Sequence, residues 1–490
     1  MASSPAPVGA SAARGALWTI LFSALSKAVA LGSQVALAWL LFPEDFGLAA
    51  MTLSFTSVVG IVGGNYLRNV LIQRPDRFEQ EAGQVFWLSL ALNVLAAVTL
   101  WLLSPLAGFI FKEPRVVSLI GVVALTAPIN ALSVVHSAAL NRKLCFRQLA
   151  AINFGAVLVQ HGGAVLLASL GCGAYSLLVP AAAMSAWTAV ASRLAAGRLP
   201  LGWPEPRRWL LLRSSVGWLM FNSLFVAVQN YGVNFAIGVV HREPAVAGYY
   251  FWGFTMASQA VFLIATNLQG VLFPALSKLT AEPDRQFEAV RRTCQTLTVA
   301  VVPLCVLQIL LAEPAIHLVF HERWLPSVPV VQWLSLGLLT QPVSIVASAV
   351  LLARGAYSRV TLTTALTALT LVGMGLIGAH VGRQSEIARC TGLGLLLTNL
   401  LTGWIACREM SRDWKELVAL IAPPLALGIL SGAIGGGVAH LLQGAPPLLV
   451  MASVVMAAAG SYLLLVRLFL GQVVVDFVSR LRTPANCHTN

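Results

Sequence analysis

The chain has 490 residues, of which 58% are hydrophobic and only 10% are charged, and its formal net charge is +13. Soluble globular proteins carry about 25% charged residues, so this composition excludes an ordinary soluble domain and indicates a chain that lies in lipid. The basic residues lie between apolar segments, which is the distribution that membrane topology produces and not one that indicates a nucleic-acid partner.

Apolar runs recur along the whole chain, separated by short polar breaks. A helix needs about 20 apolar residues to cross a bilayer. The residues before the first run, 1–14, form a tail, and this run is too long for the core of a signal peptide. The fold class predicted is an all-α integral membrane protein with about 14 transmembrane helices. We expect these over 15–41, 46–72, 83–111, 115–140, 147–170, 174–197, 213–240, 245–276, 289–320, 327–353, 358–381, 387–407, 416–441 and 446–470.

Lys and Arg are retained on the cytoplasmic side of a membrane protein, so their distribution predicts its orientation. With both termini placed in the cytoplasm, 24 basic residues fall on the cytoplasmic side and 6 on the other. Those six are Lys112, Arg115, Arg242, Arg323, Arg383 and Arg389. The bias supports the helix count as well, because one helix too many or too few would invert every later loop.

A weak internal repeat is present. Trp18 recurs as Trp218, and the pair Pro43 and Gly47 recurs as Pro244 and Gly248. Chance is the alternative, since Pro and Gly are common at helix ends. A repeat of six helices would place two units in the same orientation. We therefore expect a cytoplasmic tail over 1–14, a six-helix bundle over 15–197, a cytoplasmic linker over 198–212, a second bundle over 213–407, two further helices over 416–470 and a cytoplasmic tail over 471–490.

The predicted helices lack a carboxylate near their centres, because all 18 Asp and Glu residues fall in loops or near helix ends. Glu313 is the most ambiguous of them. Ion-coupled transporters commonly use buried carboxylates as ion sites. This absence argues against a multidrug or cation-coupled exporter.

One cation lies deep in the first predicted helix. Lys27 falls near the expected membrane midplane, where a Lys costs about 2.5–3.5 kcal/mol on insertion scales. Ser23 and Gln34 share its helical face. Such a polar stripe is expected to face protein or a water-filled cavity. The alternative is a Lys that reaches the interface or pairs structurally with a carbonyl group.

Uncharged polar residues repeat this pattern on other helices. Amides can also simply hold helices together, so each is weaker evidence than their coincidence on the predicted helices 1, 2, 7 and 8. The candidate cavity residues are Lys27, Ser23, Gln34, Arg68, Asn69, Asn222, Gln229, Asn230 and Asn267. A polar cavity that is cationic and without acid favours an anionic substrate, such as a phosphate or pyrophosphate.

Two further segments have two interpretations each. The aromatic run from Tyr249 to Trp252 could stack on sugar rings, but we favour an interfacial aromatic belt. Gly428 and Gly432 have the spacing of small residues that permits close helix packing, and a groove for a lipid tail is the alternative.

Motifs of catalysis and cofactor binding are absent from the sequence. It contains no G-x-x-x-x-G-K-[ST], no nucleophile elbow and no H-E-x-x-H. The seven Cys are scattered and form no C-x-x-C pair. We expect no catalytic residues, no metal and no cofactor. A membrane glycosyltransferase or ligase is a weaker alternative, because the predicted outer loops are all short.

An ordered set of fragments resembles Wzx-type oligosaccharide flippases, which belong to the polysaccharide transporter family of the MOP exporter superfamily. It includes AWLLFPEDFGLAAM from residue 38, LIQRPD from 71, GCGAYSLL from 171, GYYFWG from 248, VLFPALSKL from 271, ERWLPSVPVVQWLSL from 322 and VLLARGAYSRV from 350. The resemblance covers about residues 12 to 420. The chain departs from the family pattern at Gly64-Asn65-Tyr66, where relatives have an acidic-Leu-Gly element.

The resemblance implies two six-helix bundles around a V-shaped central cavity, plus two further helices. It implies a place in the bacterial inner membrane and an undecaprenyl-pyrophosphate-linked oligosaccharide as substrate. This substrate would be flipped by alternating access for exopolysaccharide, capsule or O-antigen biosynthesis, with Lys27 in the place of a pyrophosphate-binding cation. It also implies a polysaccharide polymerase and chain-length or export proteins as partners. A lipid II flippase is an alternative that the sequence separates poorly from this one.

Overall fold

The computed structural model describes residues 8–60, 67–68, 71, 78–143, 145–197, 199, 202–205, 209, 213–442 and 444–469. All the regular elements in these ranges are helices. The chain forms two compact units, Met1–Gly248 and Tyr249–Asn490. Most of the predicted linker 198–212 and of the two tails lies outside the described residues, so the predicted domain boundaries stay a prediction.

The first unit contains the helices up to the first turn of α11. They are α1 (Val8–Leu40), α2 (Pro43–Gly60), α4 (Phe78–Phe111), α5 (Arg115–Ala131), α6 (Val134–Arg142), α7 (Phe146–Ser169), α8 (Tyr175–Ala196) and α10 (Arg213–Val240), followed by α11 (Pro244–Lys278). The second unit continues with α12 (Pro283–Val319), the 3-10 helix η4 (Glu322–Ser327), α13 (Val328–Leu338), α14 (Gln341–Ala353), α15 (Tyr357–Val381), α16 (Gln384–Glu409), α17 (Trp414–Leu441) and α18 (Pro447–Phe469).

These helices match the predicted membrane spans. In the part of the chain that the structure describes, ten helices are long and apolar enough to cross a membrane, or twelve if each of two bent pairs is one span. Helices α2 and α11 lie where the remaining two predicted spans were expected. The fold class predicted from the sequence, an all-α multi-pass membrane protein, is therefore confirmed.

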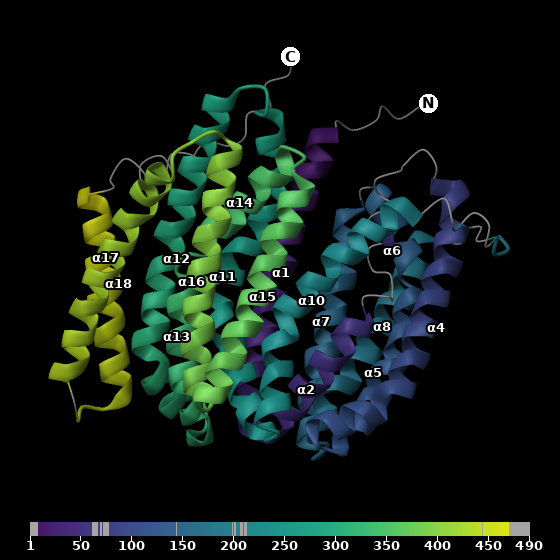
Figure 1. The fold of residues 1–490 in the computed structure, drawn as a ribbon, viewed down its shortest axis with the longest axis horizontal. Helices are drawn as coiled ribbons and strands as arrows, with labels where there is room; N and C mark the ends of the chain where they lie inside the picture. The colour runs from purple at the N-terminus through teal and green to yellow at the C-terminus, as the bar shows by residue number, and fades with distance from the viewer. Residues whose placement is uncertain are drawn as a thin grey trace. The chain divides into compact units, whose positions relative to one another are not determined.

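Helix α7 of the first unit packs against both α1 and α8 (Figure 1). Two side-chain contacts define how α1 and α7 are aligned. Arg147 lies 5.0 Å over the ring of Trp18, and the rings of Phe22 and Phe154 lie 5.5 Å apart. From Trp18 to Phe22 on α1 the partner on α7 also moves forward in the sequence, from Arg147 to Phe154, so the two helices run parallel. A residue of α1 therefore lies at the same level along the helix axis as the residue of α7 about 129 to 132 positions later in the sequence.

A single predicted helix over 115–140 is in fact two, because α5 and α6 meet at an angle of 41°. Pro128 lies inside α5 and cannot donate a backbone hydrogen bond to the preceding turn. At the break, Ser133 satisfies the freed carbonyl of Asn130 twice, with its backbone N–H at 3.1 Å and its hydroxyl at 2.8 Å. The hydrogen bonds from Ser133 thus replace one that the break in the helix removes.

The start of α2 crosses the start of α11 at a pair of glycines. A Cβ added to Gly47 would overlap the carbonyl group of Pro244, and one added to Gly248 would overlap the carbonyl group of Pro43. The glycine of each segment thus contacts the proline of the other segment. A local two-fold axis produces such reciprocal contacts. These four residues are the ones that recur in the sequence, so the repeat has a structural counterpart at this crossing.

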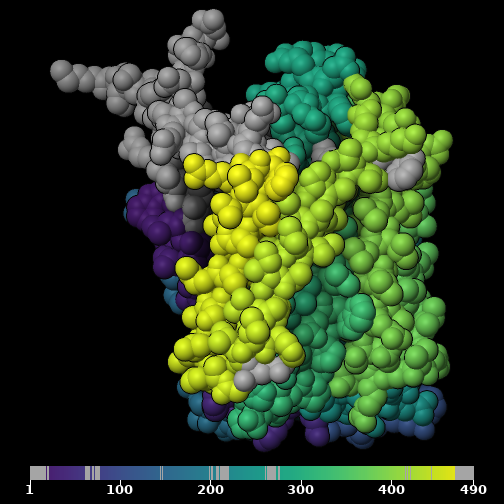
Figure 2. Space-filling model, turned by 90° about the vertical axis from the view of Figure 1, so that its left-hand side faces the viewer, coloured from purple at the N-terminus to yellow at the C-terminus, as the bar shows by residue number. Residues whose placement is uncertain are grey.

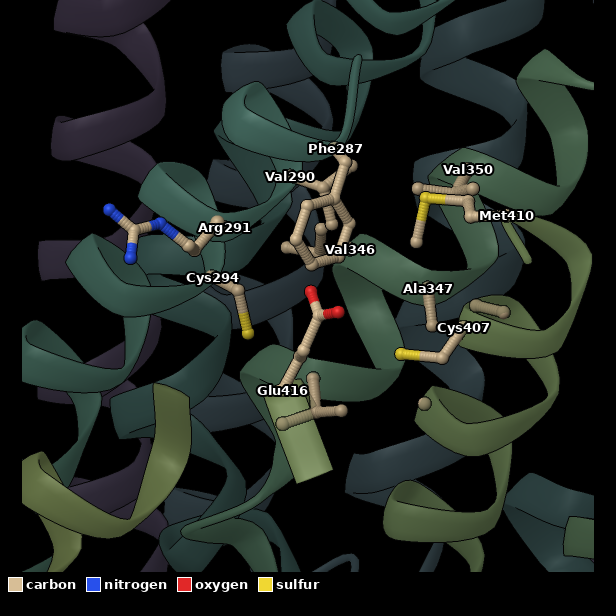
Figure 3. Close-up of a pocket in the computed structure, with 13 residues that line it drawn as sticks. Phe287, Val290, Arg291, Cys294, Val346, Ala347, Val350, Cys407, Met410 and Glu416 are labelled. Carbon is tan, nitrogen blue, oxygen red and sulfur yellow. The ribbon is translucent and has the colours of Figure 1, made fainter. Parts of the chain in front are cut away.

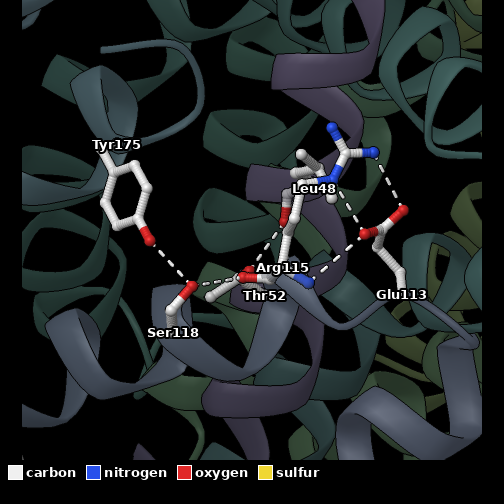
Figure 4. A network of polar contacts seen from close by, with 6 residues as sticks. All are labelled: Leu48, Thr52, Glu113, Arg115, Ser118 and Tyr175. Atoms are coloured by element: carbon white, nitrogen blue, oxygen red, sulfur yellow. Dashed lines mark hydrogen bonds and ion pairs between the residues drawn. The ribbon is translucent and has the colours of Figure 1, made fainter.

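Polar contacts join the starts of α5 and α8. The hydroxyl of Tyr175 donates to Ser118 Oγ at 2.7 Å, and Ser118 Oγ donates to the carbonyl of Arg115 at 2.9 Å (Figure 4). The Arg115 guanidinium binds Glu113 through two hydrogen bonds, of 2.8 and 3.0 Å. These hydrogen bonds lower the pKa of the Glu113 carboxyl below its usual value.

Small residues allow α17 to pack closely on α12 and α18 in the second unit. Figure 2 shows α17 and α18 side by side on one face of that unit. A Cβ on Gly428 would overlap Val302 Cγ1 of α12, and one on Gly435 would lie 2.9 Å from Ala458 Cβ of α18. The packing interpretation of these glycines therefore agrees with the structure.

A buried polar clamp joins α11, α12, α14 and α16 at one end of the second unit. Gln286, fully buried, donates to the carbonyl of Leu276 at 3.0 Å and accepts from Arg354 Nε at 2.9 Å. Arg354 Nη1 also donates to the carbonyl of Glu409 at 2.6 Å. Four helix ends are thus joined by two side chains.

The interpretation of the aromatic run as an interfacial belt is wrong for two of its members. Tyr250 is 3% exposed and donates to Thr391 Oγ1 at 3.2 Å, and Trp252 is 1% exposed and stacks on Trp324 with ring centroids 4.7 Å apart. Both rings lie in the core of the second unit, where neither a headgroup nor a sugar reaches them.

Candidate functional site

The polar stripe predicted on α1 lies inside a membrane-spanning stretch. Lys27 is half-buried and lies about 5 Å along the axis from the midpoint of Leu21–Leu40, the apolar part of α1. Ser23 and Gln34 are half-buried as well. The alignment of α1 with α7 places Lys27 level with residues 156 to 159 of α7.

Unsatisfied polar atoms surround this level of α1 and α7. Ser33 Oγ, Gln34 Oε1 and Gln160 Oε1 are buried and have no hydrogen-bond partner among the described residues. Burying such atoms without a partner is unfavourable, and in native structures it calls for an explanation such as a bound water or ligand. The two helices therefore carry polar groups that can bind something other than the protein itself.

Arg68, the second predicted cation, lies at a cavity of about 780 Å³ in the first unit. We call this cavity the α5–α8 pocket. Ligand sites commonly measure about 300–1,000 Å³, so its size suits a small molecule or headgroup. Its lining comprises Arg68, Asn130, Ser133, Val134, Ser137, Asn141, Leu149, Ala150, Ile152, Asn153, Ala156, Val157, Met184 and Thr188.

The polar lining of the α5–α8 pocket consists of one guanidinium, three carboxamides and three hydroxyls, with no acid and no aromatic ring. Asn141 Nδ2 donates to the carbonyl of Ser137 at 3.1 Å. The side chains of Arg68, Asn130 and Asn153 make no hydrogen bond to any described residue. These three side chains remain available to a ligand.

The predicted residues of α10 lie on a different neighbour. Asn222 and Gln229 are half-buried and Asn230 is exposed. Helix α10 packs on α2 and α4, whereas α1 packs on α7. The structure therefore brings Arg68 together with Asn130, Asn141 and Asn153, whereas the main neighbours of α10 are α2 and α4.

Two predicted residues cannot be placed. Asn69 lies outside the described residues, and the backbone of Asn267 belongs to α11 while its side chain is not described. Their role in a cavity stays a prediction.

Carboxylates within the long helices lie away from helix centres. Glu313 of α12 is exposed, and Glu288 of the same helix pairs with Arg291 and Arg292 at 3.0 and 2.7 Å. In the part of the chain that the structure describes, no acidic side chain lines the α5–α8 pocket.

A second cavity lies in the other unit, between α12, α14 and α16 and the start of α17. It is lined mainly by apolar side chains with Cys294 and Cys407, and the Glu416 carboxylate points into it (Figure 3). Its volume is about 30 Å³, room for only about two water molecules and far below the roughly 300–1,000 Å³ of ligand sites. It is therefore a packing gap and not a substrate site.

Sequence reasoning missed the contribution of α7. Asn153 and Gln160 are seven residues apart, so they lie on one face of α7, as Asn222 and Gln229 do on α10. That spacing could have identified them. Asn130 and Asn141 could not be found in this way, because their approach to α7 depends on the bend between α5 and α6.

Comparison with known proteins gives consistent similarities. Residues 36–329 match the family described as "Polysaccharide biosynthesis protein". The succinoglycan biosynthesis transport protein ExoT of Rhizobium meliloti (strain 1021) is 26% identical over 330 residues, 65% of this chain and 66% of that protein. The lipopolysaccharide biosynthesis protein WzxC of Escherichia coli (strain K12) is 24% identical over 336 residues, 66% of each chain. The chain thus matches just under two thirds of the length of these two relatives.

Solved structures share the fold at lower identity. The lipid II flippase MurJ in an inward closed conformation has a TM-score of 0.74 at 11% identity, covering 94% of this chain and 100% of that one. An inward-facing multidrug resistance MATE family transporter of the MOP superfamily has a TM-score of 0.62 at 14% identity. That match covers 79% of this chain and 94% of the transporter. The fold is therefore that of MOP transporters.

Proposed function

Because the chain belongs to the polysaccharide biosynthesis protein family and has the fold of MOP transporters, we propose that it flips an undecaprenyl-pyrophosphate-linked oligosaccharide across the bacterial inner membrane. The relative ExoT is named as a transport protein, and the proposal makes this chain a multi-pass membrane transporter and not an enzyme. The proposal concerns the substrate, the membrane and the direction. The substrate is loaded at the cytoplasmic face and released outside to a polymerase.

The observation that carries the proposal is the half-buried Lys27 inside the apolar stretch of α1. A pyrophosphate cannot cross hydrocarbon unaided, because a charged group loses its hydration there. A cation at this depth offers the headgroup a charge-assisted hydrogen bond in place of water. Ser23 and Gln34 on the same face add neutral donors and acceptors.

The relatives support a lipid-linked sugar as cargo. ExoT is named for succinoglycan transport and WzxC for lipopolysaccharide biosynthesis. A cationic drug, the cargo of the main rival, would favour an acidic site. The acids of α12 are exposed or paired with Arg, as at Glu313 and Glu288, and the charged member of the α5–α8 pocket is Arg68.

Alternating access supplies the mechanism of the proposal. The site around Lys27 opens first to the cytoplasm and then to the outside, while the undecaprenyl chain stays in lipid. Only the headgroup then needs a polar path. The excess of basic residues in alternate loops, 24 against 6, orients this path with both termini in the cytoplasm.

The test replaces Lys27 by Ala and by Arg in a strain that depends on this gene for its polymer. We expect Lys27→Ala to lower polymer export by at least about tenfold, the value of a charge-assisted hydrogen bond, and to accumulate the lipid-linked oligosaccharide. Lys27→Arg should restore most of the export, because it keeps the charge. Lys278→Ala, which removes an exposed Lys at the end of α11, is the matched control. Full export by Lys27→Ala at normal membrane levels would contradict the proposal.

A further inference from the structure

The α5–α8 pocket has a chemistry that the translocation of a pyrophosphate alone does not require. Its cation lies beside three carboxamides and three hydroxyls. Each carboxamide carries two donors and an acceptor, and the hydroxyls of Ser133 and Thr188, whose protons bind backbone carbonyls, offer acceptors. One phosphate group needs donors only, so the acceptors call for a ligand that also donates.

The lining excludes several classes of ligand. A cationic drug requires an acid or an aromatic ring, and a divalent metal ion requires carboxylate or His ligands. None of these groups belongs to the lining of the described pocket. A polyhydroxylated ligand with an anionic group fits all of its polar residues, because hydroxyls both donate and accept and the anion matches Arg68.

The position of the pocket relates it to Lys27. Its residues on α7 run from Leu149 to Val157. The alignment of α1 with α7 places these level with positions 17 to 28 of α1, and so at the level of Ser23 and Lys27. A headgroup held at Lys27 would have its sugars within reach of this level, since one helical turn rises only about 5.4 Å.

We infer that the α5–α8 pocket binds the glycan part of the substrate, with Asn130, Asn141 and Asn153 on sugar hydroxyls and Arg68 on an anionic group. The inference rests on the proposed function and divides the substrate between two sites. Lys27 binds the pyrophosphate that every such lipid-linked substrate has. The pocket binds the sugars, which differ from one substrate to another, and so determines specificity. The anionic group is an oxyanion beside sugar hydroxyls, either a sugar carboxylate or the phosphate next to the first sugar.

The test measures thermal stabilisation of the purified full-length protein by two probes. One is undecaprenyl pyrophosphate without sugar, and the other is the lipid-linked oligosaccharide extracted from a strain lacking this gene. Wild type should be stabilised by both, and more by the second. In Asn141→Ala/Asn153→Ala the extra stabilisation due to the sugar should disappear, while the response to undecaprenyl pyrophosphate stays and shows that the variant is folded.

Lys27→Ala should show the reverse pattern, with the response to undecaprenyl pyrophosphate reduced by about tenfold in apparent affinity. An Asn141→Ala/Asn153→Ala variant that keeps the full sugar-dependent increment would overturn the inference and leave the proposed function standing. A wild-type protein that responds to neither probe would instead contradict the proposed function.

Soluble sugars identify the source of the anion. Trigalacturonate carries a carboxylate on each sugar unit, whereas maltotriose is a neutral trisaccharide. If Arg68 binds a sugar carboxylate, Arg68→Gln should lower the affinity for trigalacturonate by about tenfold and leave that for maltotriose unchanged. If Arg68 binds the phosphate, the same variant should instead lower the affinity for glucose 1-phosphate. Arg285→Gln, at an exposed pair with Glu282 in the other unit, is the control. Unchanged affinity for all three sugars in Arg68→Gln would overturn the role of Arg68.

Discussion

Gly47 and Pro244 lie so close together that a Cβ at position 47 would overlap the carbonyl group of Pro244. The clash would be with backbone, which cannot rotate away as a side chain can. We predict that Gly47→Ala destabilises the protein by about 1–3 kcal/mol or more, the cost of overpacking. Thermal unfolding of the purified protein in detergent measures this.

The reciprocal variant Gly248→Ala should behave in the same way, because it meets Pro43 as Gly47 meets Pro244. Gly121→Ala in α5 is the matched control, since a Cβ there would meet nothing within 4 Å. The control should be neutral or stabilising, because Ala is a better helix former than Gly. Equal unfolding temperatures for all three variants would contradict the close crossing of α2 and α11.

A second prediction concerns the packing of α17 on α12. Gly428→Ala should cost about 1–3 kcal/mol, because its Cβ would overlap Val302 Cγ1. Val302→Ala should relieve this clash, so the two changes together should cost less than their sum, with a coupling of about 0.5–3 kcal/mol. Gly437→Ala on the same helix has open space and serves as control. Additive effects in the double-mutant cycle would show that the two residues do not touch.

A third prediction concerns the clamp around Gln286. Arg354→Met keeps an unbranched apolar stem but removes both hydrogen bonds of the guanidinium, leaving the acceptors on Gln286 and Glu409 without their donor. Loss of a donor to a buried acceptor costs about 1–3 kcal/mol. We expect the unfolding temperature to fall in Arg354→Met and to stay unchanged in Arg285→Met, which removes an exposed ion pair. A fall of equal size in the two variants would rule out the clamp.

The fourth prediction is a dependence of stability on pH. Hydrogen bonds from Arg115 hold the pKa of the Glu113 carboxyl below its usual value of 4.5. The stabilisation is therefore complete above pH 4.5 and is lost as the pH falls through the lower pKa of the folded state. We expect the difference in unfolding temperature between wild type and Glu113→Gln to be largest near neutral pH and to shrink below pH 4.5.

The control for the pair of Glu113 and Arg115 is Glu282→Gln, which removes an exposed carboxylate bound to Arg285. Its effect should be small at every pH, because exposed ion pairs contribute little. A Glu113→Gln difference that stays constant down to pH 3 or so would mean that the ionised carboxylate does not stabilise the fold.

Much of the fold could be predicted from apolar runs, because lipid imposes the length of a spanning helix. The helix Arg213–Val240 agrees with the predicted 213–240 at both ends. The bend between α5 and α6 was not predicted, although Pro128 lies within the run. A proline removes a hydrogen bond, but whether the helix breaks depends on what packs around it.

The candidate site was predictable where a residue is costly in lipid. Lys27 could be selected because its charge falls inside a predicted span, whereas Arg68 lies at the end of its predicted helix. The burial of Trp252 was not predictable, because it depends on Trp324, a partner distant in the sequence. Asn130 and Asn153 lie on different helices, and only the packing of α5 to α8 brings them to one cavity.

The lining of the α5–α8 pocket has an evolutionary consequence. Apart from Arg68, all its residues come from one continuous stretch of chain between Asn130 and Thr188, whereas Lys27 lies outside that stretch. A single exchange of the corresponding gene segment between two such transporters would therefore replace the glycan-contacting wall and leave the pyrophosphate-binding helix in place. New cargo could arise by recombination in one step, which predicts that chimaeras exchanged at residues 115 and 196 follow the donor of the inserted segment in the polymer that they export.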